Sequence, residues 1–235
     1  MKRKGGLGFL PEWLVGLGET AEEQFFRKLD LRGKVVFDVG AFHGLTALFF
    51  SQTARMVVAF EPNPLNCARA FQNILVNRLE NVFLLNVAVD EKRGELPFVY
   101  EDNMAGRGSA DQAIAARTVE GAPSARFITV PAIRLDEVVR AGFPMPDFIK
   151  IDVEGMEMRA LRGAEEILRS RRPSLYVEIH GATTPDKERN VSRIVQFLEC
   201  QGYTTLFHVE SGAPITSGSA SGAKEGHLYC DVGPA

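Results

Sequence analysis

Short apolar runs alternate with segments of helical periodicity along most of the chain. Helical patterns follow the first, second, fourth and fifth of the apolar runs, and another, over 19–33, precedes the first run. Uninterrupted apolar strands that alternate with helices are typical of a parallel sheet covered by helices on both faces. The sequence therefore predicts an α/β fold, with strands at 34–39, 56–60, 82–89, 147–152, 174–180, 204–209 and 227–232.

The last two apolar runs break this alternation, because no helical pattern separates them. The intervening segment, 210–226, is rich in Gly, Ser and Ala, a composition typical of flexible linkers. We therefore expect a mobile loop that joins two antiparallel strands. The mostly parallel sheet would then end in an antiparallel hairpin at one edge.

The connection between the third and fourth predicted strands is longer than the others. Two further strand-like runs, 95–101 and 126–133, flank a stretch of small and polar residues. We interpret 95–135 as an insertion at the functional edge of the sheet, with a loop that closes over a bound molecule. The sequence shows no second domain, so 1–235 is predicted to be one domain with an N-terminal helical segment, 1–33.

The composition is that of an ordinary folded protein, since 45% of the 235 residues are hydrophobic and 24% are charged. The formal net charge of −3 argues against a nucleic-acid partner, because such partners need clustered positive charge. No stretch approaches the ~18 apolar residues of a membrane span, and the basic N-terminus lacks the apolar core of a signal peptide. Three cysteines, Cys67, Cys200 and Cys230, follow no zinc or redox spacing, which indicates reduced thiols in a cytoplasmic protein without membrane contact.

A glycine turn follows the first predicted strand. Asp38 ends this strand, and Gly40 and Gly44 flank the turn, where glycine lets the backbone turn sharply and approach a ligand closely. Glu61 follows Asp38 by 23 residues, at the tip of the second strand, and suits a ribose diol. These features fit a nucleotide cofactor, with a plain structural turn as the alternative.

Two residues favour a cationic cofactor over NAD. Phe42 stands about where a dinucleotide-binding turn has its middle glycine, so its side chain would crowd a pyrophosphate. The acid Asp38 suits a cation better than a diphosphate. The turn therefore favours S-adenosylmethionine, and NAD is the weaker alternative.

Three acids cluster where the fourth predicted strand ends: Asp152, Glu154 and Glu157. Ligands of such sheets lie outside the carboxyl ends of the strands, so Asp152 is predicted to lie in the cleft. We assign Glu157 instead to the positive end of the helix that follows. Glu178 and His180 are two positions apart in the neighbouring strand and therefore share one side of it. Asp152, Glu178 and His180 can thus converge on one site.

This set of side chains suits methyl transfer to a hydroxyl. The reaction is an in-line displacement at an activated sulfonium, and a positioned base helps because an alkyl hydroxyl is a poor acid. Asp152, Glu178 and His180 are the candidate catalytic residues, and which of them is the base is left open. A divalent cation bound by Asp152 and Glu178 is the less favoured alternative, so no metal site is assigned.

Four segments of the chain, in this order and spacing, resemble the FkbM-type methyltransferases: "FDVGAFHG", "AFEPNP", "FIKIDVEGMEMRALRGA" and "PSLYVEIHG". The similarity covers about residues 20–181, and the "KIDVEG" block is its most specific part. It implies a Rossmann-like class I methyltransferase fold of seven strands, with S-adenosylmethionine as cofactor. Acceptors in that family are typically hydroxyls of sugars, glycolipids or natural products. N-methylation and a non-catalytic, nucleotide-binding scaffold stay open as alternatives.

The resemblance also implies positions for the parts of the cofactor. These are Asp38, Gly40 and Gly44 for the methionine, Glu61 for the ribose, Asn63 and Ala88 for the adenine, and Asp152 near the methyl group. Glu23, in the predicted first helix, either reaches the amino end of the cofactor or is an exposed helix residue. The acceptor, a small molecule or glycan, is expected to contact Asn103, Arg107 and Ser109 of the insertion, and Glu154. A homodimer is left open.

Overall fold

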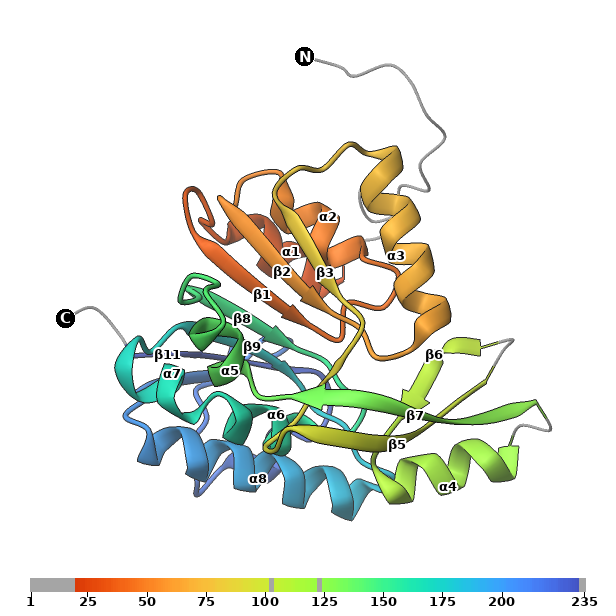
Figure 1. Cartoon of the computed structure of the whole chain (residues 1–235). Coiled ribbons are helices and arrows are strands. Elements are labelled where there is room, and N and C mark those ends of the chain that lie inside the picture. The colour runs from red at the N-terminus through yellow and green to blue at the C-terminus, as the bar shows by residue number, and fades with distance from the viewer. Residues whose placement is uncertain (1–19, 102–103, 122–123, 233–235) are drawn as a thin grey trace.

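Seven strands form the larger sheet of the protein, which a computed structural model describes over residues 20–101, 104–121 and 124–232 (Figure 1). The strand order is β10-β11-β9-β8-β1-β2-β3, and β11 runs antiparallel to both of its neighbours while the other pairs are parallel. The predicted sheet, mostly parallel with an antiparallel pair at one edge, is confirmed. Its strands are β1 (Val35–Val39), β2 (Met56–Phe60), β3 (Val82–Leu85), β8 (Phe148–Ile151), β9 (Ser174–Glu178), β10 (Thr205–His208) and β11 (His227–Asp231).

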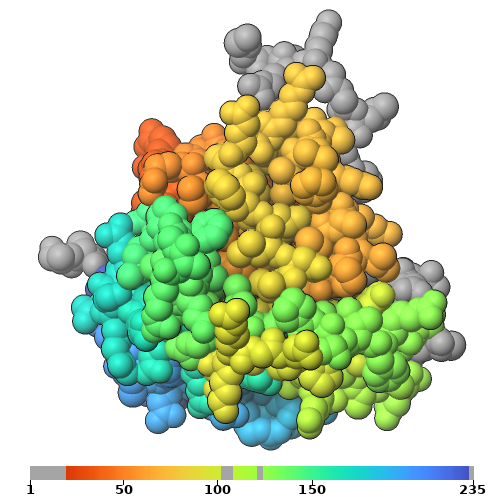
Figure 2. Space-filling model, viewed as in Figure 1, coloured from red at the N-terminus to blue at the C-terminus, as the bar shows by residue number. Residues whose placement is uncertain are grey.

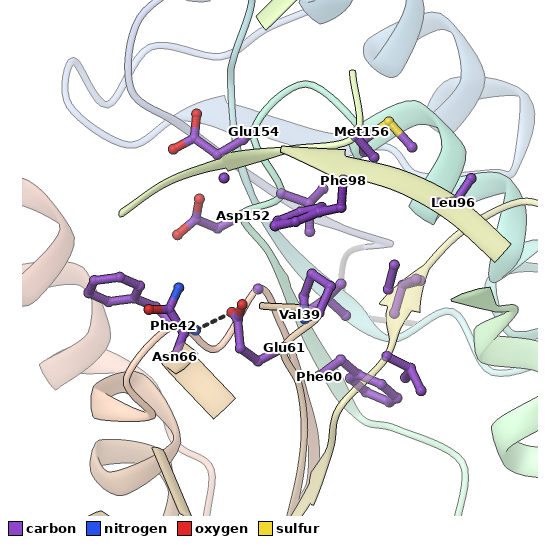
Figure 3. A pocket seen from close by; sticks show the side chains of 18 of the residues that line it. Val39, Phe42, Phe60, Glu61, Asn66, Leu96, Phe98, Asp152, Glu154 and Met156 are labelled. Atoms are coloured by element: carbon purple, nitrogen blue, oxygen red, sulfur yellow. Dashed lines mark hydrogen bonds between the residues drawn. The ribbon is translucent and has the colours of Figure 1, made fainter. Parts of the chain in front are cut away.

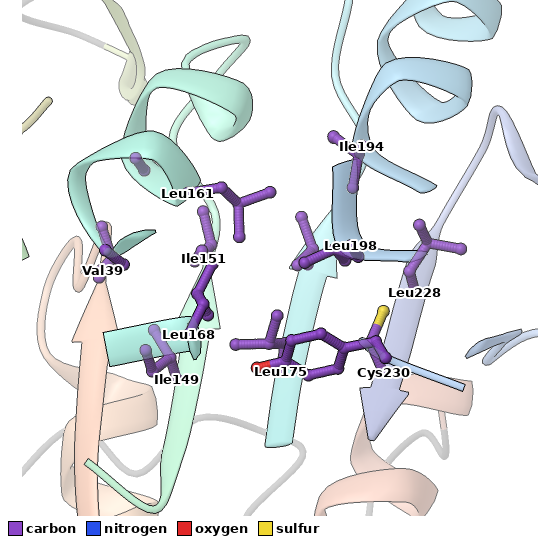
Figure 4. Packing of buried hydrophobic residues seen from close by; sticks show 14 of the residues in the cluster. Val39, Ile149, Ile151, Leu161, Leu168, Leu175, Ile194, Leu198, Leu228 and Cys230 are labelled. Carbon is purple, nitrogen blue, oxygen red and sulfur yellow. The ribbon is translucent and has the colours of Figure 1, made fainter. Parts of the chain in front are cut away.

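Helices cover both faces of this sheet, because side chains along each strand point alternately to opposite faces. In β1, Val35 and Phe37 pack against α5 to α8, whereas Val36 packs against α1 and α2. Figure 4 shows part of the first of these two cores, where side chains of α6, α7 and α8 meet those of the strands. The helices are α1 (Ala21–Lys28), α2 (Leu45–Ser51), α3 (Pro64–Val76), α5 (Leu135–Arg140), α6 (Glu157–Gly163), α7 (Glu165–Ser170) and α8 (Thr184–Cys200).

A second sheet stands against the carboxyl ends of β1 and β2, with the order β4-β7-β5-β6. The apolar run 82–89, predicted as one strand, divides between the sheets, because β3 ends at Leu85 and β4 (Ala88–Val89) pairs with β7. In Figure 2 the yellow segment that makes this transition crosses the visible face of the molecule. The remaining strands are β5 (Gly94–Glu101), β6 (Met104–Ser109) and β7 (Ala125–Ile133).

The small, polar stretch inside the insertion was predicted to be a loop, and this prediction is wrong. It forms β6 and a helix, α4 (Gln112–Gly121). Small side chains are what this packing requires, since a Cβ at Gly108 would lie 2.7 Å from the ring of Phe98 on β5. Low hydrophobicity therefore reflects a close contact between strands, and not a free loop.

The segment 210–226 between the last two strands is also more ordered than predicted. It contains a short 3₁₀ helix, η2 (Ala220–Ala223), which packs against α8 with both alanines buried. Small side chains again allow the close approach. The helical pattern that follows the fourth apolar run forms two helices, because Ala164 leaves helical geometry between them. Among the described residues, no helix is long and apolar enough to cross a membrane.

Candidate active site

A first cavity, of about 280 Å³, opens where the carboxyl ends of the strands meet the second sheet (Figure 3). Phe98 and Leu96 of β5 form an apolar wall on one side, and Glu61 lies on the other. This is the edge at which the sequence predicted a ligand. The predicted site residues that line this cavity are Gly40, Glu61, Ala88, Asp152, Glu154, Glu178 and His180.

A second cavity, of about 250 Å³, adjoins the first, and Gly40, Phe42, Asp152 and Glu178 line both. Helix α1 forms part of its wall through Glu22 and Glu23. Glu23 is buried, and its carboxylate accepts a hydrogen bond from the N-cap residue of α1. The interpretation of Glu23 as an exposed helix residue is therefore wrong, and its contact with a cofactor stays a prediction.

The turn after β1 is shaped by close backbone contact. Gly40 has φ +82°, and a Cβ there would lie 1.7 Å from the carbonyl oxygen of Asp152, so no other residue fits. Phe42 also has a positive φ, +52°, which is uncommon outside glycine. Its backbone N–H donates to Glu61 Oε2 at 2.8 Å. The turn of β1 is thus tied to the end of β2, at the cavity.

Glu61 is buried and surrounded by donors. Besides Phe42, the backbone N–H of Asn63 donates to its carboxylate at 2.8 Å, and the side chain of Asn66 also bonds to it. Burial raises the pKa of Glu61 to about 7. A carboxylate has about four lone-pair sites, so Glu61 keeps the capacity to accept from a further donor at the cavity.

Three predicted cofactor contacts lie behind the walls of the two cavities. Asn63 is buried and caps α3 by accepting from the N–H of Leu65 at 3.0 Å, whereas Asn66, one turn later, lines the first cavity. Asn66, and not Asn63, is therefore the candidate for a contact with the adenine. Gly44 is the N-cap of α2 and packs against Ala70 of α3.

Asp38, the third of these contacts, belongs to a buried ion pair that sequence reasoning missed. Lys150 lies beside Asp38 in the parallel pair of β8 and β1, and its Nζ is 3.6 Å from Asp38 Oδ1. The same Nζ lies 3.0 Å from Asp152 Oδ2. Burial would lower the pKa of Lys150, but the charges of Asp152 and Asp38 outweigh it and raise the pKa. Lys150 thus stays charged and fixes Asp152 at the junction of the two cavities.

The predicted catalytic residues do converge. His180 Nε2 lies 3.4 Å from Glu178, 3.7 Å from Glu154 and 3.9 Å from Asp152. One ligand atom each of Asp152, Glu178 and His180 lies within 4.8 Å of the other two, so this group could also hold a metal ion. The cleft therefore presents carboxylates and an imidazole at the place where both cavities meet.

Glu157 has a function that the sequence did not reveal. It begins α6, as predicted, but its carboxylate is fully buried and lies 2.9 Å from His180 Nδ1. Asn190 of α8 donates to its other oxygen at 2.8 Å, and Gly155 N–H donates at 2.9 Å. Glu157 therefore orients the imidazole, and no local pattern in the sequence indicates this contact between α6 and the end of β9.

The pKa values of the residues in this cluster are shifted in different directions. Burial alone would lower the pKa of His180, but hydrogen bonds to Glu157 and Glu178 outweigh it and raise the pKa to about 11. Burial also raises the pKa of Glu154, to about 7. Burial acts in the same direction on Glu178, but its hydrogen bonds to His180 and His227 outweigh it and lower its pKa. Burial raises the pKa of Asp152 as well. At neutral pH His180 is therefore a cation, and the pKa of Glu154 lies close to the ambient pH.

Of the acceptor contacts predicted in the insertion, the structure describes the side chain of Ser109. Ser109 is buried, and its hydroxyl donates to the carbonyl of Glu154 at 2.6 Å, so it supports the loop after β8. Arg107 belongs to β6, but its side chain lies outside the described residues. Asn103 lies outside them as well. Of the four predicted contacts, Glu154 lines the cavity, with φ +48°.

Two curated relatives resemble the chain. The hexuronic acid methyltransferase AglP of Haloferax volcanii is 29% identical over 180 residues, which are 69% of this chain and 69% of the relative. The methyltransferase sdnD of Sordaria araneosa is 28% identical over 157 residues, which are 56% of this chain and 60% of the relative.

The fold also resembles that of a solved structure. The crystal structure of the methyltransferase FkbM from Methylobacillus flagellatus KT aligns with a TM-score of 0.54 and 16% identity. The alignment covers 84% of this chain but 43% of the solved one. This likeness concerns the fold, which is that of the class I methyltransferases.

The family model of the methyltransferase FkbM domain matches residues 38–205. The match begins at Asp38, at the end of β1, and extends over β8 and β9, so it includes the acids and the histidine of the cleft. The chain therefore belongs to the FkbM methyltransferase family.

Proposed function

We propose that the protein transfers a methyl group from S-adenosylmethionine to a hydroxyl of a sugar, a glycolipid or a natural product. The observation that carries this proposal is the pair of adjoining cavities that share Gly40, Asp152 and Glu178. An extended cofactor with its reactive atom near the middle fits two cavities joined at a catalytic cluster. The family membership supports the methyl donor.

In this proposal the adenosine part of the cofactor occupies the first cavity. Glu61 accepts hydrogen bonds from the ribose diol, and the adenine lies against Ala88 with Asn66 nearby. The methionine part extends into the second cavity, beside α1 and its acids Glu22 and Glu23. The carboxylates at the junction favour a sulfonium cation, because opposite charges attract strongly in a partly buried site.

The acceptor hydroxyl lies at the junction, opposite the sulfonium. Its oxygen attacks the methyl carbon, the carbon–sulfur bond breaks, and the electron pair of that bond stays on sulfur. The hydroxyl proton passes to Glu154, because a base works best when its pKa is near the operating pH and that of Glu154 is raised to about 7. His180, a cation at neutral pH, is a donor that can hold the acceptor in line.

A sugar hydroxyl is favoured as the acceptor by one relative, which is described as a hexuronic acid methyltransferase. That protein is 29% identical, so the preference is part of the proposal. The cluster of carboxylates also fits it, since an alkyl hydroxyl needs a base whereas a neutral amine is already a nucleophile.

Calorimetric titration with S-adenosylmethionine, S-adenosylhomocysteine and NAD tests the cofactor. We expect the first two to bind in the micromolar range and NAD not to bind, and tight binding of NAD alone would refute the proposal. Turnover with a panel of sugars and hydroxylated metabolites then tests the acceptor. Each reaction is run with a chelator and again with added magnesium, because loss and recovery of turnover would assign a metal to Asp152, Glu178 and His180.

A further inference from the structure

A third cavity, of about 190 Å³, lies between α4 of the insertion and the N-terminal part of α8. These two helices are far apart in sequence, but Arg117 of α4 donates to the backbone carbonyl of Ala182, just before α8. In Figure 1 the start of α4 lies next to that end of α8. The cavity is small, so it suits a group about the size of one sugar ring.

The third cavity lies next to the reacting centre. His180 lines both the first and the third cavity, just as Asp152 and Glu178 line both the first and the second. If the cofactor spans the first two cavities, as proposed above, the third is the space left for the other substrate. A molecule there can present a hydroxyl to Glu154, whose carboxylate lies 3.7 Å from His180 Nε2.

The two acids that line the third cavity are engaged by other groups of the protein. Asp111 accepts backbone N–H groups at the start of α4, at 3.0 Å each. Asp186 accepts from the hydroxyl of Thr183 at 2.6 Å and pairs with Arg189. Asp186 is therefore paired with a cation of the protein, and Asp111 caps the start of α4.

Arg193, which also lines this cavity, differs from the two acids because it has no such contact among the described residues. Arg193 follows Arg189 by four residues on α8, so the two arginines share one face of the helix. The side chain of Arg193 is exposed, and within the part of the chain that the structure describes it forms no hydrogen bond or ion pair. Arg193 thus offers a guanidinium to a ligand without breaking an existing contact.

We propose that the third cavity is the acceptor subsite and that Arg193 binds an anionic group of an acidic acceptor. A guanidinium suits this function because it can bind a carboxylate or phosphate through two parallel hydrogen bonds. Arg189, on the same face, already pairs with Asp186, so Arg193 is the arginine left for the ligand, and His180 stands at the inner end of the cavity. The acceptor is then held at both ends, by its anionic group at α8 and by its reacting hydroxyl at the cluster.

Calorimetry on the full chain, saturated with S-adenosylhomocysteine, tests this assignment. The probes are methyl glucuronide, glucose 6-phosphate and the neutral methyl glucoside. We expect at least one of the anionic probes to bind about 10–100-fold tighter than the glucoside, the range given by one charge-assisted contact. The stronger of the two anionic probes distinguishes a carboxylate from a phosphate.

Variants locate the contact. Arg193→Ala is expected to remove the preference for the anionic probe while leaving the affinity for S-adenosylhomocysteine unchanged, and Arg193→Lys should keep part of it. Arg55→Ala is the matched control, because Arg55 is an exposed arginine next to the amino end of β2, whereas the cavities lie at the carboxyl ends of the strands. Ala113→Trp, at an exposed position of α4 that lines the cavity, should block all three probes.

The outcomes separate the two proposals. Failure of the wild-type protein to bind S-adenosylhomocysteine would refute the proposed function. Normal binding of that product with no preference for either anionic probe would overturn the acceptor subsite alone. So would a preference that survives Arg193→Ala, or probe binding that survives Ala113→Trp.

Discussion

Glu157 Oε1 lies 2.9 Å from Nδ1 of His180, and this contact fixes which nitrogen of the imidazole faces the cleft. The carboxylate is fully buried and is itself held by Asn190. With Nδ1 occupied, Nε2 is left to point at the carboxylates of the cluster. A residue at the start of α6 thereby orients the imidazole that follows β9.

Glu157→Gln should lower the pKa of His180 by about 1–3 units, the usual effect of one close opposite charge. Gln keeps the size of the side chain, so the fold should survive. NMR titration of the histidine side chains, with His180→Gln to assign the signal, measures the change. Glu188→Gln is the control, because Glu188 is on α8 but pairs with Lys224, away from the cleft. An unchanged titration in Glu157→Gln would show that the buried carboxylate does not set the charge of His180.

The raised pKa of His180 also makes stability depend on pH. A histidine with an ordinary pKa of 6.5 when unfolded and about 11 when folded contributes stability that is complete below pH 6.5 and is lost as the pH rises toward 11. Between pH 7 and 9 the unfolding free energy should therefore fall by up to about 1.4 kcal/mol per pH unit from this group. Urea unfolding of the wild type and of His180→Gln tests it, since the variant should show a smaller slope. Parallel slopes would contradict the raised pKa.

Lys150→Met should destabilise the protein strongly. The variant removes the ammonium that lies between Asp38 and Asp152 and leaves two carboxylates without their cation, a change that typically costs about 3–5 kcal/mol. Denaturant unfolding measures the loss, with Lys34→Met, at an exposed position before β1, as the control. Adding Asp38→Asn to Lys150→Met should recover part of the stability. A double variant that is no more stable than the single one would argue against the pair.

The Lys150 pair marks the limit of what the sequence could predict. Asp38 and Lys150 each stand inside a buried strand, and the register of the parallel pair places them side by side. The alternation of apolar runs with helices predicted the parallel sheet, but it gives neither the order of the strands nor their register. The sequence therefore shows two charges in buried strands but not that they are partners.

Other features of the site depend on tertiary packing that no local pattern encodes. The contact of Glu157 with His180 requires the position of α6 relative to β9. The strand-like runs 95–101 and 126–133 correspond to β5 and β7 of the second sheet. The sequence did not predict β6 and α4, because these consist largely of small and polar residues, and Gly108 is needed for close contact with Phe98 and not for periodicity. The left-handed backbone of Phe42 likewise follows from its bond to Glu61, at a position where sequence statistics expect glycine.

Glu61→Ala should weaken binding of S-adenosylmethionine by about 10–100-fold, because hydrogen bonds to a charged group are worth about 1.5–3 kcal/mol. Since the pKa of Glu61 is raised to about 7, affinity in the wild type should also increase as the pH rises through 7 and the carboxylate ionises. Calorimetry at several pH values measures both effects. Glu80→Ala is the control, because Glu80 is exposed just before the amino end of β3 and does not line the first cavity. Full affinity in Glu61→Ala would remove this residue from the ribose site.

The assignment of Glu154 as the base can be tested with two variants whose turnover should depend on pH in different ways. If Glu154 accepts the proton, turnover in the wild type should rise with pH through about 7, the raised pKa of this carboxyl group. Glu154→Gln should remove that rise and lower turnover by about 10²–10⁴-fold, the usual contribution of a positioned base. The folded structure should be retained, because the carboxylate of Glu154 lines the cavity and is partly exposed.

Asp152→Asn provides the contrast. Asp152 is paired with Lys150 and lines both the first and the second cavity, so its loss should lower turnover at every pH while the rise through 7 persists. Turnover is measured with the best acceptor of the sugar panel at saturating S-adenosylmethionine. If Asp152→Asn loses the rise and Glu154→Gln keeps it, Asp152 is the base, and the raised pKa of Glu154 then reflects its burial beside the acceptor and not catalysis.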